Sequence, residues 1–193
     1  MTSSVLKSTL KNSIAERTVC CYHTRMLISI DTEASGPCPT LGDVIDIGAV
    51  VVETGLSRTF TTGIMLPMFD AFNERAYRSI GMTREEHLAA PITVEEGFLS
   101  FGKWLDSLGD ERKMMVSDNP AFDWQWVNFG LCLFYERNPL GFSARRIGDM
   151  YSGLRRNIDD QNSWKKLRVT AHNHKPLNDA MGNAEALLKI WEK

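Results

Sequence analysis

Residues 26–53 read MLISIDTEASGPCPTLGDVIDIGAVVVE, and this stretch decides the fold class. Two runs rich in β-branched and apolar residues, 27–32 and 44–53, predict buried strands. A third expected strand, 57–65, follows a tight turn at Thr54-Gly55, so the three would form an antiparallel meander. Helix and strand patterns alternate after it. The sequence therefore predicts an α/β fold, with a mixed central sheet flanked by helices.

The rest of the chain supplies the other elements. Strands are expected at residues 114–118 and 144–149, and helices at 70–80, 83–90, 93–108, 122–135 and from Pro176 onward. Thr93 and Glu96 have the spacing of a capping box at the start of the helix over 93–108.

Composition excludes several classes of protein. The chain has 193 residues, 43% of them hydrophobic and 24% charged, so it can bury a core and is neither disordered nor a collagen-like fibre. The apolar run 44–52 is interrupted by Asp46 and is too short to span a bilayer. Four cysteines without a C-x-x-C pair predict reduced thiols and a cytoplasmic location rather than a disulfide framework.

The first 25 residues differ from the rest. They carry Lys7, Lys11, Arg17 and Arg25 against the single acid Glu16, and they lack the apolar segment of a secretory signal. We expect residues 1–25 to be a poorly ordered N-terminal extension and residues 26–193 to form one domain. A transit peptide, or translation from Met26, are the alternatives.

Positive charge is concentrated late in the chain. Residues 137–175 hold nine lysines and arginines against three acids, although the formal net charge of the chain is only −2. Such a stretch could form a phosphate-binding rim, but composition alone favours a solvated helix face.

The sharpest local feature is Asp31-x-Glu33. In a strand, residues i and i+2 point to the same face, so two carboxylates would lie side by side. Hard oxygen ligands of this kind suit Mg²⁺ or Mn²⁺. A D-x-E triplet by itself is more often a pair of solvated acids.

Two further acids begin helices. Asp123 follows the apolar strand 114–116 and the turn Ser117-Asp118-Asn119, where Asp118 is a rival candidate and also a candidate helix cap. Asp179 lies in the first turn of the helix that Pro176 opens. His174 precedes that helix on a loop and titrates near neutral pH.

Together these three features resemble the DEDDh branch of the DnaQ-like 3′–5′ exonucleases, which have the RNase H-like fold. The resemblance covers most of residues 26–193. The Phe122-Asp123 pair favours Asp123 over Asp118, and the tyrosine branch would need Tyr where Lys175 stands. Within the branch, the run SDNPAFDW is most similar to small exoribonucleases of the mycobacterial RNase AS type, followed by phage exonucleases.

The resemblance implies the roles of the site residues. Asp31, Glu33 and Asp179 would bind one divalent ion, and Asp31 and Asp123 a second, so that two Mg²⁺ or Mn²⁺ ions serve one phosphodiester hydrolysis. His174 would be the general base. His172 lacks the five-residue offset to Asp179, and the tripeptide His172-Asn173-His174 is not the motif of HNH endonucleases.

The residues that would contact the substrate are less clearly indicated by the sequence. Ser35 in the strand-end backbone, Asn119 and Phe122 are the candidates, with Trp124 and Trp126 as further aromatics and Arg145, Arg146, Arg155 and Arg156 as phosphate contacts. The leading expectation is a 3′–5′ exoribonuclease acting on single-stranded RNA, in the form of a possible homodimer. The alternatives are a DNA exonuclease of phage or repair type, a catalytically silent nucleic-acid-binding module, and a small-molecule phosphodiesterase.

Overall fold

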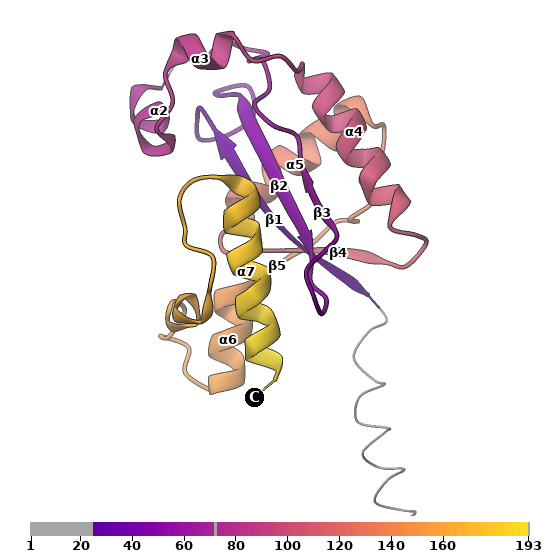
Figure 1. Cartoon of the computed structure of the whole chain (residues 1–193), viewed down its shortest axis with the longest axis vertical. Helices are drawn as coiled ribbons and strands as arrows, with labels where there is room; N and C mark the ends of the chain where they lie inside the picture. The colour runs from indigo at the N-terminus through magenta and orange to yellow at the C-terminus, as the bar shows by residue number, and fades with distance from the viewer. Residues whose placement is uncertain (1–24, 72, 193) are drawn as a thin grey trace, which may run out of the picture.

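The fold is built on one mixed sheet. The computed structural model describes residues 25–71 and 73–192. Its five strands lie in the order β3-β2-β1-β4-β5 (Figure 1). β1 pairs antiparallel with β2 and β2 with β3, whereas β1–β4 and β4–β5 are parallel. The strands are β1 (Met26–Ala34), β2 (Val44–Val51), β3 (Thr59–Thr61), β4 (Lys113–Ser117) and β5 (Ala144–Arg146).

Helices cover both faces of the sheet. On one face α4 (Val94–Ser107) and α5 (Pro120–Phe134) bury an aromatic core that includes Phe98, Phe101 and Trp126. On the other face α7 (Pro176–Trp191) lies across β1 and β2, and its alanines pack with Val116, Ile147 and Trp164. The remaining helices are α2 (Glu74–Ile80), α3 (Arg84–Leu88), α6 (Ile147–Arg155) and the 3₁₀ turn η1 (Ser163–Leu167).

Most predicted elements are present, and the capping box is confirmed. The Thr93 side chain accepts the Glu96 N–H, and the Glu96 carboxylate accepts the Thr93 N–H. The antiparallel meander of the first three strands is also confirmed.

Three elements differ from the sequence prediction by more than two residues at one end, or by two or more at both. The strand expected over 57–65 is regular only at Thr59–Thr61, because the chain turns at Gly63, whose φ is +71°, although Thr62 and Met65 still donate backbone hydrogen bonds to Ile47 and Ile45. The helix expected over 70–80 begins at Glu74, where the Asn73 side chain caps it by accepting the Ala76 N–H. The strand expected over 144–149 ends at Arg146, where α6 begins.

The sequence analysis missed α6 altogether. Its apolar positions, Ile147, Met150, Tyr151 and Leu154, have helical spacing, and that signal could have identified it.

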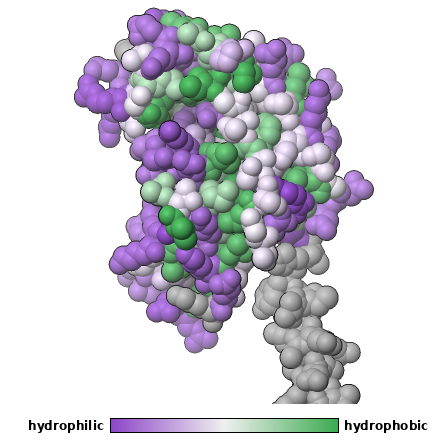
Figure 2. Space-filling model, viewed as in Figure 1, coloured by the Kyte–Doolittle hydropathy of each residue, from purple (hydrophilic) through white to green (hydrophobic). Residues whose placement is uncertain are grey.

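Surface character differs between the two ends of the molecule. On the face shown in Figure 2, hydrophobic residues gather at the upper end beside α2 and α3, and hydrophilic residues cover the lower left, where α6 and η1 lie. Within the two described ranges, no helix is both long and apolar enough to cross a membrane. The expected N-terminal extension lies, apart from Arg25, outside these ranges.

Candidate active site

Three carboxylates that are far apart in the sequence meet at the end of β1, the middle strand of the sheet. Asp31 and Glu33 project from the end of β1, and Asp179 projects from the first turn of α7. One carboxylate oxygen from each of the three residues lies within 4.8 Å of the other two. The structure therefore brings together three of the four predicted carboxylates in a group that could hold a metal ion.

A glycine on β2 permits this approach. Gly48 pairs with Asp31 across the sheet, and the start of α7 rests directly on it. A Cβ atom at Gly48 would lie 2.1 Å from both the Leu177 nitrogen and the Pro176 carbonyl carbon. The position of Asp179 over β1 thus depends on a residue without a side chain.

The loop before α7 wraps around Asp179 and holds it. The Asn173 N–H donates to Oδ1 and the His174 N–H donates to Oδ2, both at 3.1 Å, and the carboxylate is buried. His174 reaches this geometry with a φ of +55°, a left-handed conformation that costs free energy for a residue with a side chain. Its Nδ1 lies 3.3 Å from Glu33 Oε1.

Asp123 is buried beside the cluster and held by different partners. Its Oδ1 accepts the Thr32 N–H at 3.0 Å and the Thr32 hydroxyl at 2.9 Å, and its Oδ2 accepts the Ser117 hydroxyl. The three-carboxylate cluster does not include it. Its rival Asp118 instead pairs with Lys165 and does not cap α5 through its side chain.

Burial and crowding raise the pKa values of these acids. Burial is the largest cause for Asp31, whose pKa lies well above its usual value, followed by the charges of Asp123 and Asp179. Burial and the charge of Asp179 raise the pKa of Glu33 to about 8. Burial also raises the pKa of Asp123 to about 6, against the hydrogen bonds from Ser117 and Thr32. A cation among the carboxylates would relieve this repulsion, so the donor set fits a divalent ion.

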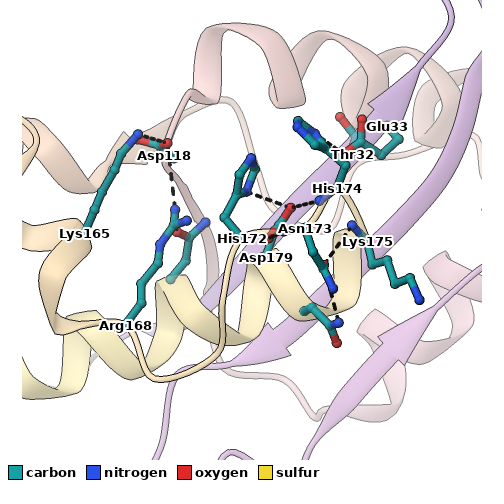
Figure 3. Close-up of polar contacts among 12 residues, drawn as sticks. Thr32, Glu33, Asp118, Lys165, Arg168, His172, Asn173, His174, Lys175 and Asp179 are labelled. Atoms are coloured by element: carbon teal, nitrogen blue, oxygen red, sulfur yellow. Dashed lines mark hydrogen bonds and ion pairs between the residues drawn. The ribbon is translucent and has the colours of Figure 1, made fainter. Parts of the chain in front are cut away.

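His172 belongs to the site, although the sequence analysis rejected it as the base. Its Nδ1 lies 2.9 Å from Asp179 Oδ2, and its ring lies 4.5 Å from that of His174. Figure 3 shows both histidines beside Asp179. Spacing along the sequence could not reveal this contact, because the loop folds back on itself.

The expected substrate residues have different surroundings. Asn119 is exposed, and Phe122 is partly buried against Trp126. The Ser35 side chain is fully buried and accepts the Asp43 N–H at 2.8 Å, so its hydroxyl is not available to a substrate. Trp126 is a core residue.

Three of the arginines expected to contact phosphate are tied to the fold or lie at the far end of α6, whereas the lysines of η1 line a groove. Arg146 donates to the Asp118 carbonyl at 3.2 Å and pairs with Asp149, which ties it to the fold. Arg155 and Arg156 lie at the C-terminal end of α6, away from β5. Lys165, Lys166 and Arg168, which belong to the basic stretch 137–175 considered above as a phosphate-binding rim, line a groove next to His172.

Solved structures with this fold are nucleases. No protein-family model matches the chain. The nuclease domain of 3'hExo, described as a DEDDh family member bound to rAMP, superposes with a TM-score of 0.66 over 89% of this chain and 94% of that one, at 12% identity. The zinc-bound complex of Escherichia coli ExoI with single-stranded DNA gives 0.62 over 88% of this chain and 41% of that one, at 14% identity. These neighbours confirm the RNase H-like fold class.

In sequence and in fold the chain is similar to 3′–5′ exonucleases, the class of enzyme that its motifs also predict. The similarity in sequence is to a curated relative. It is the Escherichia coli protein called 3'-5' DNA exonuclease Cap18, which is 27% identical over 180 residues, 87% of this chain and 92% of the relative. The resemblance to the RNase AS type stays a prediction.

Proposed function

We propose that the chain removes nucleotides one at a time from the 3′ end of single-stranded DNA in a reaction that needs divalent metal ions. The cluster of Asp31, Glu33 and Asp179 is the observation that carries the reaction chemistry. DNA is favoured because the curated relative at 27% identity is named as a DNA exonuclease.

RNA, the substrate that the sequence analysis expected, is the second candidate. The observation in its favour is that two neighbours in fold bind ribonucleotides: one in a complex with rAMP, the other recognising the stem-loop of histone mRNA. Both are below 14% identity to this chain, so they weigh less than the curated relative.

The carboxylates are assigned as the ligands of two ions. Asp31, Glu33 and Asp179 would hold the first, and Asp31 and Asp123 the second, with Asp123 acting directly or through water. Bound Mg²⁺ or Mn²⁺ would neutralise the scissile phosphate and raise the acidity of the attacking water. The hydrogen bonds from Thr32 and Ser117 would fix the orientation of the Asp123 carboxylate.

His174 is proposed as the general base. Its Nδ1 faces Glu33, which leaves Nε2 to take a proton from the attacking water. The water oxygen then bonds to phosphorus as the bond to the 3′ oxygen breaks, and the products are a nucleoside 5′-monophosphate and a strand shortened by one nucleotide with a new 3′ hydroxyl. His172 would support Asp179 rather than act as the base.

The terminal nucleotide is proposed to lie against Asn119 and Phe122. Asn119 is exposed next to the strand end and can donate a hydrogen bond to sugar or base, and Phe122 offers part of its ring for stacking. Ser35 is proposed to shape the site indirectly, through Asp43, whose carboxylate accepts the N–H groups of Met68, Phe69 and Ala71.

The test is a time course on matched 5′-labelled DNA and RNA strands with Mg²⁺, with Mn²⁺ and with EDTA. A metal-dependent ladder that shortens from the 3′ end, faster on DNA, is expected. Faster trimming of RNA would reverse the substrate assignment. Intact strands in every lane would overturn the proposal and favour a silent binding module or a small phosphodiester substrate. Dimerisation and a cytoplasmic location remain predictions, the first of which sedimentation can check.

A further inference from the structure

Two hollows lie near the carboxylate cluster, one lined by Glu33 and the other by His172. One, of about 420 Å³, is lined by Glu33 and His174 together with apolar side chains such as Ile64, Ile80 and Met82. The other, of about 460 Å³, is lined by η1 and the following loop and reaches His172, which contacts Asp179. We call this second hollow the η1 groove; its residues are Asp118, Lys165, Lys166, Arg168, Val169, Thr170, Ala171 and His172.

The two hollows differ in charge. The η1 groove carries Lys165, Lys166 and Arg168 against a single acid, Asp118. The apolar hollow carries the acids Glu33 and Asp46 against Lys175. Glu33 is assigned to the metal ion, which leaves Asp46 and Lys175 as one acid and one cation there, so a polyanionic strand that enters the site meets its more attractive surface on the η1 side.

Two cations of the η1 groove, Arg168 and Lys165, are held by contacts within the fold. Arg168 is only one-tenth exposed and stacks on Trp164 at 4.9 Å, and its Nη2 lies 3.8 Å from Asp118 Oδ2. Its Nε is buried and has no hydrogen-bond partner within the described part of the chain. Lys165 Nζ lies 2.7 Å from the same Asp118 oxygen, and both lysines are exposed residues. In Figure 3 Asp118, Lys165 and Arg168 lie on one side of His172 and Asp179, and Glu33 lies on the other.

We propose that the η1 groove binds backbone phosphates of the substrate strand on the 5′ side of the terminal nucleotide. Lys165 and Lys166 make the phosphate contacts, and Arg168 supplies a fixed positive charge beneath them. Asp118 competes with phosphate for Lys165. The inference rests on the proposed function and adds to it the path by which the strand leaves the site, over η1 and not over the apolar hollow.

The direct test measures binding in an Asp31→Asn background, which prevents hydrolysis. Fluorescence anisotropy gives the Kd of a long single-stranded DNA oligomer over a range of salt concentrations. Adding Lys165→Ala and Lys166→Ala should weaken binding and reduce the slope of log affinity against log salt by about 1.4, since each phosphate contact on a single strand contributes about 0.7. Asp118→Asn should act in the opposite direction and lower the Kd.

A matched control removes the same charge elsewhere. Lys103 on α4 and Arg112, before β4 at the end of the strand remote from the site, are both exposed. The double variant Lys103→Ala/Arg112→Ala should leave Kd and slope close to those of the Asp31→Asn parent. Equal losses in both double variants would show a general charge effect and overturn the assignment of the groove.

Substrate length separates the groove from the reaction centre. In the active enzyme, Lys165→Ala/Lys166→Ala should raise KM for a long oligomer and leave KM for a dinucleotide unchanged, because a dinucleotide has no phosphate upstream of the scissile one. An equal rise for both substrates would place the lysines at the scissile phosphate and overturn the proposal. If the unmodified protein degrades no strand and the Asp31→Asn parent binds none, the proposed function itself fails. If both behave as expected and the groove variants are unaffected, only the assignment of the η1 groove fails.

Discussion

At the residue scale, the two histidines beside Asp179 have different contacts and so should have different functions. His174 Nδ1 faces Glu33, whereas His172 Nδ1 faces Asp179. If His174 is the general base, His174→Ala should lower kcat by ~10²–10⁴-fold, the usual contribution of a positioned base. Single-turnover rates at saturating Mn²⁺ would measure this loss directly.

His172→Ala is the matched control for that experiment. A residue that orients a metal ligand typically changes metal affinity by ~10–100-fold. We therefore expect the Mg²⁺ concentration for half-maximal rate to rise, with kcat at saturating metal nearly restored. If His172→Ala lost as much kcat as His174→Ala, the assignment of the base would be wrong.

The Ser117–Asp123 hydrogen bond gives a second prediction at this scale. Ser117→Ala removes one donor to a buried carboxylate. Hydrogen bonds to charged groups contribute about 1.5–3 kcal/mol, so urea unfolding at a pH above the raised Asp123 pKa should show a loss of that order. Ser107→Ala on α4, whose hydroxyl donates to a carbonyl at an exposed site, should change the free energy of unfolding by less than about 0.5 kcal/mol.

At the element scale, the contact between β2 and α7 decides whether the site forms. Gly48→Ala would place a methyl group where the backbone of Pro176 and Leu177 lies, so the start of α7 must move away from β1. Overpacking of this kind costs about 1–3 kcal/mol. We expect a lower free energy of unfolding and a larger loss of activity than the loss of stability alone explains, because Asp179 and His174 move with the helix.

Gly153→Ala on α6 is the corresponding control. A Cβ atom there meets nothing within 4 Å, and alanine is a better helix former than glycine by roughly 0.5–1 kcal/mol. This variant should be slightly more stable and fully active. Thermal unfolding and the rate on a DNA oligomer test both glycines, and an active Gly48→Ala protein would contradict the proposed role of the β2–α7 contact.

At the scale of the whole molecule, crowded carboxylates link stability to pH and to metal. The pKa of Glu33 is raised from 4.5 to about 8 and that of Asp123 from 3.8 to about 6. At a pH between the usual and the raised pKa of each group, the folded protein therefore binds more protons than the unfolded chain. The metal-free protein should therefore be most stable at acid pH with respect to these groups, and lose stability as the pH rises towards about 8.

Bound metal ions should reverse this trend, since they replace the missing protons. The rise in Tm on adding Mn²⁺ to EDTA-treated protein should thus be larger near pH 8 than near pH 5. Scanning calorimetry at both pH values measures it. A rise in Tm that is independent of pH would show that the metal does not bind at these carboxylates.

Much of the fold could be predicted from local pattern. The β-branched runs of β1 and β2 and the capping box before α4 are signals within a few residues, and the structure has those elements there. The prediction failed for α6 and for the ends of β3 and β5. These elements are short, and turns such as that at Gly63 end them more than the preferences of their own residues do.

The sequence by itself identified the acids that gather around β1: the two-residue spacing pairs Asp31 with Glu33, and the resemblance to DEDDh exonucleases adds Asp179. Tertiary structure alone decided that Asp123 turns to Thr32 and Ser117, that Ser35 is buried, and that His172 reaches Asp179. It also placed the lysines of η1 on a groove that opens at the site. Each of these contacts joins segments that meet only when the elements pack on the sheet, as where α7 approaches Gly48 and where α5 brings Asp123 to Thr32 and Ser117. Packing between such segments leaves no periodic signal in either one.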